Sequence, residues 1–330
     1  MALRALVLGA SGHIGNAIAR ELTQHGHAVT AVSRKKDRAR NLLGLPVDYV
    51  VGDADSPEQL SSLIEGHDLV VDAAAPYPMP FFGATQDNDP NSLAYAVRRT
   101  ETLLDAVRKR DARLVFVSSF TTVPRTPSSG SSPWQASLAR LLHPYFEVKE
   151  KMESLVLDAA KRGLRAVIVN PTMCLGPWEC RARATCLIPQ LLCGEIPMAP
   201  RHVLNVIDVR DAAAGIVAAL EAERYGLPTL LCGRNVSIES LFSWICEIGG
   251  VAPPRFYVPP AVSIIALYSA DLALALFGQP MSNASLALAL TSTHDWMTAD
   301  PSQRDLGVRL RPLSETLQDS VQWHRQIGYC

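Results

Sequence analysis

Short apolar runs alternate with segments of helical periodicity over the first half of the chain. The apolar run Ala5–Leu8 is followed by Ile14, Ala17, Ile18 and Leu22, which recur at the spacing of one helix face. The later apolar runs and helical segments are, in chain order, Ala28–Val32, Val47–Val51, Leu69–Val71, Leu93–Arg108, Leu114–Val117, Tyr145–Lys161 and Ala166–Val169. Near-continuous apolar strands separated by helices predict a parallel sheet that is covered on both faces. The pattern therefore indicates an α/β fold with a Rossmann-type doubly wound parallel sheet.

The pattern becomes irregular beyond Pro171. Its clearest pieces are a strand-like run at Val203–Ile207, a helical run at Ala212–Leu220 and a strand-like run at Thr229–Leu231. We expect a dinucleotide-binding Rossmann domain over residues 1–171 and a smaller, mostly helical substrate lobe over 172–330. Parts of about 203–235 are expected to return to the Rossmann sheet. The segment Pro124–Pro133, rich in Ser, Pro and Gly, predicts a mobile loop.

The most apolar stretch of the chain is Val262–Phe277. It is shorter than the ~20 residues that span a bilayer, and Asp271 lies within it. We therefore expect no stable membrane span. A buried or pocket-lining helix is the favoured interpretation, and weak contact with a membrane surface is the alternative.

Composition and charge narrow the class of protein. The 330 residues suit one large or two modest domains, and the net charge of −1 gives no electrostatic reason to expect nucleic acid as a partner. Because an apolar strand follows Met1 almost at once, we expect no signal peptide and a cytoplasmic protein. The seven cysteines are scattered and odd in number, which favours reduced thiols. Four of them cluster without a Cys-x-x-Cys pair, so apolar packing is favoured over a metal site: Cys174, Cys180, Cys186 and Cys193.

A glycine motif follows the first apolar run. It reads Gly9-Ala10-Ser11-Gly12-His13-Ile14-Gly15 and lies between a predicted strand and a predicted helix, the context of a dinucleotide-binding turn. The first glycine permits the tight turn, the second lets a phosphate approach the backbone, and the third lets the helix pack closely on the sheet. Free N–H groups at the helix start would face the pyrophosphate. The predicted contacts are Gly9, Ser11, Gly12, His13, Ile14 and Gly15, with the His13 ring filling space or facing solvent; a glycine-rich turn without a ligand is the alternative.

The end of the second strand favours NADP(H) over NAD(H), which stays possible. An NAD-preferring site usually has a carboxylate here, whereas this chain has Ser33-Arg34-Lys35-Lys36. Arg34 is the candidate for a 2′-phosphate because its guanidinium can bind phosphate through two nitrogens, and a solvated basic turn is the alternative. Further predicted cofactor contacts follow the third and fourth strands: Asp53, Ala54, Ala73 and Ala74. Asp53 could accept from the adenine amino group or cap a helix, although Asp55 or Ser56 could equally serve as that cap.

Tyr145 and Lys149 carry the predicted chemistry, since residues four apart lie on one helix face. A free tyrosine ionises near pH ~10, and a neighbouring ammonium favours the phenolate. Tyr145 can then exchange a proton with a substrate oxygen, while Lys149 also binds the nicotinamide ribose. Ser119, at the carboxyl end of a predicted strand, would hydrogen-bond the same oxygen. An amphipathic core tyrosine is the alternative for Tyr145.

The chain resembles the extended short-chain dehydrogenase/reductases, in the branch of dihydroflavonol-reductase-like, 3β-hydroxysteroid-dehydrogenase-like and epimerase-like enzymes. The resemblance covers essentially the whole length. It rests on Gly9-x-x-Gly12-x-x-Gly15, Gly52-Asp53-x-Asp55, Val117-Ser118-Ser119, Tyr145-x-x-x-Lys149, Asn170-Pro171-Thr172-x-x-x-Gly176-Pro177, Val206–Asp211 and the segment from Asp305-Leu306-Gly307 to Trp323. It implies that Ser119, Tyr145 and Lys149 form the catalytic triad and that the backbone of Pro171, Thr172 and Met173 borders the nicotinamide. A homodimer is also a family expectation.

Two positions depart from the family pattern. Ala96 stands at about the place where many of these enzymes have an asparagine that completes a proton relay. Phe120 follows Ser119 where small residues are usual, which leaves Thr121 and Thr122 as substitutes for the serine role.

The favoured function is an NADP(H)-dependent oxidoreductase that interconverts a ketone and a secondary alcohol on a rather apolar small molecule. The apolar preference rests on Val262–Phe277, Leu187–Leu192 and the region of Trp178. A nucleotide-sugar epimerase that retains its cofactor is the enzymatic alternative, with Arg181, Arg183 or Arg201 offered to a diphosphate. A dehydratase is disfavoured because no carboxylate follows Ser119 directly. A non-catalytic NADP(H) sensor is the alternative outside the enzymes.

Overall fold

The alternating apolar runs of the first half form one parallel sheet. A computed structural model of the chain describes residues 2–34, 40–74, 93–123, 143–277, 290, 297–298 and 301–330. The strands are β1 (Arg4–Leu8), β2 (Ala28–Ser33), β3 (Asp48–Val51), β4 (Leu69–Asp72), β5 (Arg113–Val117), β6 (Ala166–Pro171) and β10 (Pro228–Leu231). They lie in the order β10-β6-β5-β4-β1-β2-β3, and all neighbours are parallel. The strand order reverses between β1 and β4, as in a doubly wound sheet. The predicted fold class is confirmed.

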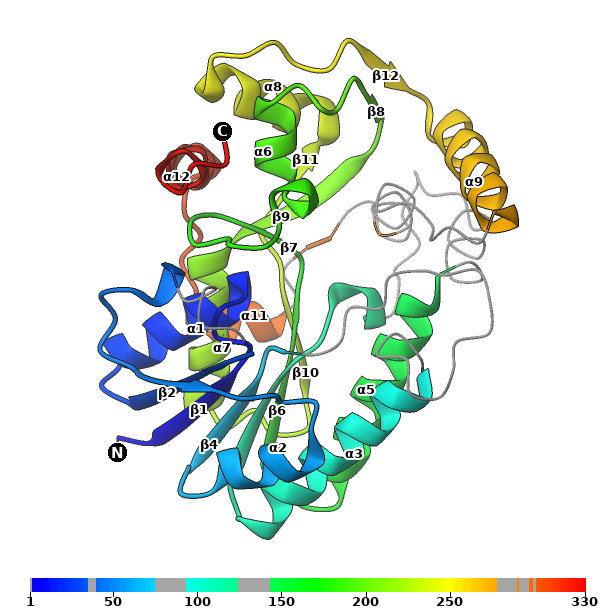
Figure 1. Ribbon diagram of the computed structural model, residues 1–330. Helices are drawn as coiled ribbons and strands as arrows, with labels where there is room; N and C mark the ends of the chain where they lie inside the picture. The colour runs from blue at the N-terminus through cyan, green and yellow to red at the C-terminus, as the bar shows by residue number, and fades with distance from the viewer. Residues whose placement is uncertain are drawn as a thin grey trace.

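Helices cover both faces of this sheet (Figure 1). One face carries α1 (His13–Gln24) and α7 (Val209–Glu221), and the other carries α2 (Pro57–Ile64), α3 (Leu93–Lys109) and α5 (Pro144–Lys161). Alternate strand residues enter the two cores: in β1, Val7 packs with the first pair of helices and Leu6 with the second group. Both faces are therefore apolar, which explains the continuous runs in the sequence.

The second lobe lies beyond the carboxyl ends of the strands (Figure 1). It has a three-stranded sheet of β11 (Arg234–Ser237), β9 (Val203–Asp208) and β7 (Met173–Leu175), and a two-stranded sheet of β12 (Phe256–Val258) and β8 (Met198–Pro200). Its core is packed by α6 (Leu187–Leu192), α8 (Ile238–Gly249) and α12 (Leu313–Gln326). The short helix α11 (Pro301–Asp305) contacts β10. Of the segment predicted to return to the main sheet, β10 lies in that sheet beside β6, and α7 packs against α1.

The apolar stretch near residue 262 forms α9 (Pro260–Leu276). Ser263, Ile264 and Asp271 are buried, whereas Ile265 and Leu276 are 66% and 80% exposed. The expectation of a buried helix therefore holds for one side of α9 only, because its apolar residues are spread around the whole circumference. Among the described residues, no helix combines the length and apolar character needed to cross a bilayer. The predicted loop Pro124–Pro133 lies outside the described residues.

Candidate active site

The predicted catalytic side chains lie together at the carboxyl edge of the sheet. Ser119 follows β5, and Tyr145 and Lys149 lie one turn apart at the start of α5. The Tyr145 hydroxyl donates to Ser119 Oγ at 3.1 Å, and Lys149 Nζ lies 6.0 Å from the centre of the Tyr145 ring. All three residues are at most 5% exposed. The structure thus brings Ser119 to the helix face of Tyr145 and Lys149, although Ser119 lies 26 positions before Tyr145 in the sequence.

Ser119 is the hydroxyl that meets Tyr145. Its Oγ also accepts from the Thr121 hydroxyl at 2.9 Å, so it receives two hydroxyl donors. The Thr122 hydroxyl instead lies 2.8 Å from the Ser119 carbonyl oxygen and 2.6 Å from Glu153 Oε2, and these two acceptors share its single proton. A serine that accepts twice still has its own proton to give, and that proton is suited to a substrate oxygen. The geometry favours Ser119 over either threonine.

A buried carboxylate that the sequence analysis missed holds this loop in place. Glu153 Oε2 accepts from the Thr122 hydroxyl at 2.6 Å and from Asn170 Nδ2 at 2.7 Å, and it also accepts from the Ser118 hydroxyl. It joins the loop after β5 to the end of β6, on both sides of Ser119. The signal was present in the sequence, because Glu153 stands one further turn along the face of Tyr145 and Lys149. No carboxylate directly follows Ser119 in the sequence, but α5 supplies one to the same loop in the folded chain.

The charge of Lys149 is set by its buried surroundings. Burial lowers its pKa to about 8, the Coulombic effect of Arg99 acts in the same direction, and Asp72 and Glu153 oppose it. Arg99 itself makes a bidentate pair with Asp72, with both N–O distances at 2.7 Å, and donates to Asp55 at 2.9 Å. Although burial opposes ionisation, this pair lowers the pKa of Asp72 and raises that of Arg99. Both partners therefore stay ionised behind Lys149.

The Asp72–Arg99 pair was also missed by the sequence analysis. Arg99 lies on α3, one turn after Ala96, the residue found where an asparagine was expected. Ala96 is fully buried and has no polar side chain to offer a relay. The charged pair that Arg99 forms with Asp72 therefore lies one turn along α3 from that position.

The glycine motif forms a tight turn between β1 and α1. Gly9 has a φ of +78°, and Gly12 N–H donates to the Gly9 carbonyl oxygen at 2.8 Å. A Cβ on Gly15 would lie 2.3 Å from that same oxygen, so only glycine lets α1 approach β1 this closely. Gly12 is the N-cap residue of α1 and has no side chain that could cap the helix, so the N–H groups of the first turn are left for a ligand. These features fit the diphosphate of a dinucleotide.

The His13 ring links this turn to the second lobe. Its Nε2 lies 3.0 Å from the Pro177 carbonyl oxygen, and the residue is 9% exposed. Burial lowers its pKa, so the ring is neutral and donates to the carbonyl. The expectation that His13 only fills space or faces solvent was therefore wrong. Asn41, which the sequence analysis did not name, makes a parallel link by donating to the carbonyl oxygens of Ser11 and Trp178, both at 3.0 Å.

The residues predicted to contact the adenosine lie along the tips of β2, β3 and β4. The Arg34 side chain is 66% exposed and lies 3.7 Å from Asp55 Oδ2. The Asp53 carboxylate accepts from the Asp55 N–H at 3.0 Å, while Ser56 caps α2. The Ser33 hydroxyl meets that of Ser11 at 2.8 Å. The two lysines after Arg34 lie outside the described residues. Ala54 is buried, and Ala73 and Ala74 are half-buried beside Gly9.

The residues predicted to border the nicotinamide lie where β6 continues into β7. Pro171 pairs with Leu231 in the main sheet. The Thr172 hydroxyl donates to Asn205 Oδ1 at 2.8 Å, and the same oxygen accepts from Gly233 N–H at 2.8 Å. Met173 opens β7 and is half-buried. This backbone thus crosses from one lobe to the other close to the end of β5.

Comparison with known proteins places the chain in a family. The model of the NAD-dependent epimerase/dehydratase family matches residues 5–231, so the chain belongs to that family. A putative dihydroflavonol 4-reductase of Synechocystis sp. is 27% identical over 98% of this chain and 95% of its own. Sterol demethylase protein B of Methylococcus capsulatus is 28% identical over 98% of both chains. The crystal structure of a nucleoside-diphosphate-sugar epimerase from Pseudomonas aeruginosa has a TM-score of 0.73 at 23% identity and covers 99% of both chains.

These findings establish the class of enzyme. The chain is an NAD(P)-dependent enzyme of the extended short-chain dehydrogenase/reductase type, as its motifs predicted. Its relatives include proteins named as reductases and as epimerases, so reductive chemistry and epimerisation are the two activities to weigh.

Proposed function

We propose that the protein is an NADP(H)-dependent oxidoreductase that interconverts a ketone and a secondary alcohol on an apolar small molecule. The observation that carries the proposal is the 3.1 Å contact between Tyr145 Oη and Ser119 Oγ, with the Lys149 ammonium on the same helix face. The bound cofactor supplies a hydride to the carbonyl carbon, or receives one in the reverse direction. Tyr145 transfers the proton to the carbonyl oxygen, and Ser119 donates a hydrogen bond to it.

An apolar substrate is supported by what surrounds the catalytic tyrosine. Leu290 packs against Tyr145 and Phe146, and Phe120 and Val123 pack into a cluster with Met297. The segment Leu187–Leu192 does not support this preference, because Ile188 and Leu191 of α6 lie in the core of the second lobe. The names of two relatives, a sterol demethylase protein and a dihydroflavonol 4-reductase, refer to largely hydrocarbon or aromatic compounds.

The preference for NADP(H) is supported by the tip of β2. Ser33 and Arg34 stand where an NAD-preferring enzyme usually has a carboxylate. Arg34 is exposed, and its contact with Asp55 at 3.7 Å is too long for a strong hydrogen bond. The guanidinium can therefore turn to a 2′-phosphate at little cost.

An epimerase that retains its cofactor is the second candidate. Two of the three arginines considered for a diphosphate already pair with carboxylates: Arg181 with Glu179, and Arg183 with Glu195 at 2.6 Å. This pairing favours the reductase. The sensor alternative is disfavoured because all three predicted catalytic side chains are present, with Tyr145 in contact with Ser119 and Lys149 on the same helix face as Tyr145.

The test is NADPH and NADH binding, followed by nicotinamide absorbance with ketones that range from polar sugars to apolar polycyclic compounds. Tyr145→Phe should bind NADPH normally and lose about 10²- to 10⁴-fold in turnover, because it cannot transfer the proton. Tyr49→Phe, on β3, is the matched control and should be fully active. Tight binding without net oxidation across the panel would favour the epimerase, and equal activity of Tyr145→Phe would remove this tyrosine from the mechanism.

A further inference from the structure

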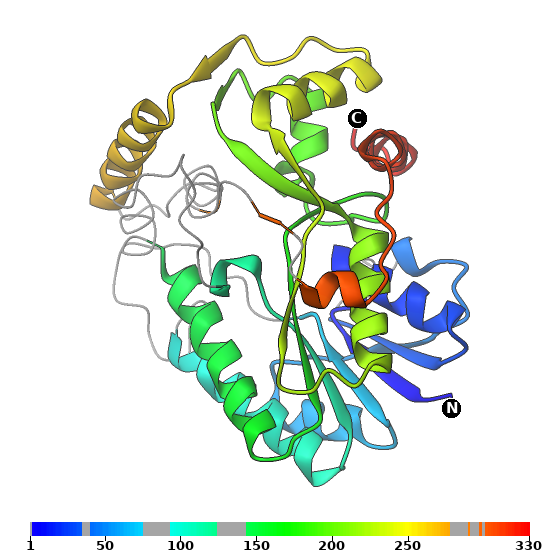
Figure 2. The ribbon, with the colours of Figure 1, turned by 180° about the vertical axis from the view of Figure 1, so that it is seen from behind.

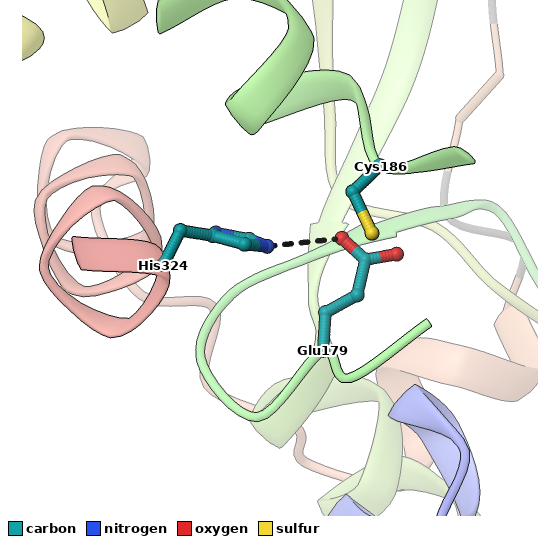
Figure 3. Close-up of side chains that lie close together, drawn as sticks. All are labelled: Glu179, Cys186 and His324. Atoms are coloured by element: carbon teal, nitrogen blue, oxygen red, sulfur yellow. Dashed lines mark ion pairs between the residues drawn. The ribbon is translucent and has the colours of Figure 1, made fainter. Parts of the chain in front are cut away.

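Three potential metal ligands meet inside the second lobe, away from the catalytic tyrosine. One atom each of Glu179, Cys186 and His324 lie within 4.8 Å of one another, and the three residues are 5%, 0% and 0% exposed. They come from the loop after β7, from the residue before α6, and from α12. Figure 3 shows the His324 ring and the Cys186 thiol directed at the Glu179 carboxylate.

The position of the proton on the His324 ring favours a cation between His324 and Glu179. Its Nδ1 lies 2.8 Å from the Ser320 carbonyl oxygen, which can only accept, so Nδ1 carries a proton. The other nitrogen, Nε2, is buried without a hydrogen-bond partner and lies 3.6 Å from Glu179 Oε2. A lone pair on Nε2 would be repelled by the carboxylate unless a proton or a metal ion lay between them. Metal-bound histidines commonly donate their second N–H to a carbonyl oxygen in this way.

The donor set is the one that zinc prefers. Thiolate sulfur, imidazole nitrogen and carboxylate oxygen bind Zn²⁺ at about 2.0–2.3 Å in a tetrahedral arrangement. Ligand atoms on such a tetrahedron are roughly 3.3–3.8 Å apart, so the three atoms need to approach by only about 1 Å. A water molecule can complete the four ligands.

Arg181 already binds the Glu179 carboxylate and would compete with a metal ion for it. Its guanidinium donates to Glu179 Oε1, from Nε at 2.8 Å and from a second nitrogen. Oε2, the oxygen that faces His324, is not part of this contact. The Arg181 side chain is 54% exposed, so it can stay on Oε1 or turn toward solvent when the ion binds. Thiolate and carboxylate together cancel the two charges of the ion.

We propose that Glu179, Cys186 and His324 form a three-ligand site for Zn²⁺ or a similar divalent transition-metal ion. The ion would tie α12 to the loop that carries Pro177, and the Pro177 carbonyl bonds to His13 of the glycine turn. Its role is thus structural, at the joint between the lobes. The proposal replaces the sequence-based expectation of simple thiol packing, since Glu179 and His324 come close only in the folded chain.

Binding must release the thiol proton. A metal ion binds the thiolate and displaces this proton.

Titration of the chelator-treated, full-length protein with Co²⁺ tests the site. We expect one equivalent to give a thiolate-to-metal charge-transfer band with tetrahedral d–d bands, and Zn²⁺ to abolish them by displacement. Cys186→Ser should lose the charge-transfer band, and His324→Gln should weaken binding at least about 10-fold while keeping it. Cys246→Ser is the matched control for a fully buried thiol, and Cys193→Ser is the control for an exposed one.

The proposal is overturned if the wild-type protein gives no thiolate band with excess Co²⁺. It is also overturned if the band survives in Cys186→Ser or disappears in Cys193→Ser, because the ion then sits elsewhere. Circular dichroism and NADPH binding show whether Cys186→Ser is folded. Where it is not, an unchanged Co²⁺ affinity in His324→Gln rejects the site by itself.

Discussion

At the scale of single residues, one face of α5 combines the proposed proton donor, Tyr145, with two buried ionisable side chains. Tyr145, Lys149 and Glu153 follow one another at four-residue intervals and are all buried. The Tyr145 hydroxyl donates to Ser119. Burial disfavours the charged form of Lys149 and so lowers its pKa. Glu153 accepts a hydrogen bond from Thr122 and thereby fixes the loop that carries Ser119. Glu153 acts through its neighbours and is a positioning residue.

The charge of Glu153 should be visible in the pH dependence of reduction. Lys149 must be protonated to act, and its pKa of about 8 predicts that kcat/KM of the free enzyme falls above about pH 8. Glu153 raises this pKa, so Glu153→Gln should move the alkaline limb to lower pH, by on the order of half a unit. The glutamine oxygen can still accept from Ser118, Thr122 and Asn170, so the fold should persist. Glu150→Gln, on the exposed face of α5, is the control. If Glu153→Gln leaves the alkaline fall of kcat/KM at the same pH, the charge of Glu153 does not influence Lys149.

Arg34 should decide between the two nicotinamide cofactors. Loss of a charge-assisted contact with the 2′-phosphate should weaken NADPH binding about 10- to 100-fold in Arg34→Ala, and NADH binding should hardly change. Fluorescence titration with both cofactors measures this ratio. Arg110→Ala, which removes an exposed arginine paired with Glu65, is the control. An unchanged preference in Arg34→Ala would assign the selectivity to other residues.

At the scale of elements, Gly12 and Gly15 have different roles in the turn from β1 into α1. A Cβ on Gly15 would meet the Gly9 carbonyl oxygen at 2.3 Å, so α1 would have to move off the sheet. A Cβ on Gly12 would meet the same oxygen at 3.1 Å and would otherwise project from the turn. Gly15 thus serves the packing of α1 on the sheet, and Gly12 serves the approach of a ligand.

We therefore expect different effects from two alanine substitutions. Gly15→Ala should lower the free energy of unfolding by about 1–3 kcal/mol, as overpacking does. Gly12→Ala should have a smaller effect on stability and should weaken NADPH binding, because its methyl group occupies the path of the diphosphate. Urea denaturation and cofactor titration of both variants separate the two effects. Equal losses of stability with unchanged NADPH binding would contradict this division.

The elements of the first half were predictable because the inner strands of the sheet are apolar on both faces. The run at Leu114–Val117 became β5 and the helical pattern at Leu93–Arg108 became α3, within one residue at each end. The second half was not, because β7, β8 and β12 have only three residues each and carry no periodic pattern. Within the site, Tyr145, Lys149 and Ser119 were found through motifs. Arg99 was missed because its partner Asp72 lies on another element, and such a pairing is visible only after folding.

At the scale of the whole molecule, buried charges attach the C-terminal segment to the Rossmann fold. The chain runs from α11 past α7 to α12 (Figure 2). Asp208 ends β9 and caps α7, and its carboxylate accepts from Arg210 and from the Thr316 hydroxyl of α12. Arg210 also donates to Asp319 on α12 at 2.6 Å. Since α7 packs against α1, these bonds connect α12 to the helix that follows the glycine turn.

Thr316→Val should weaken this attachment in a pH-dependent way. The Thr316 hydroxyl donates to Asp208 Oδ2 at 2.7 Å, and the Asp208 side chain is 1% exposed, so its loss should cost about 1.5–3 kcal/mol at neutral pH. Burial opposes ionisation of Asp208, but Arg210 and Thr316 outweigh it and lower its pKa.

A carboxyl whose folded pKa is depressed contributes stability above its unfolded pKa of 3.8, and this stability is lost as the pH falls through the folded value. The difference between Thr316→Val and wild type should therefore be largest at neutral pH and shrink below about pH 4. Denaturation at a series of pH values measures it, with Thr102→Val as the control, because Thr102 is a half-buried helical threonine whose hydroxyl donates to the Arg98 carbonyl oxygen. A difference that stayed constant down to pH 2 would mean that the valine acts through packing, and not through the ionised Asp208.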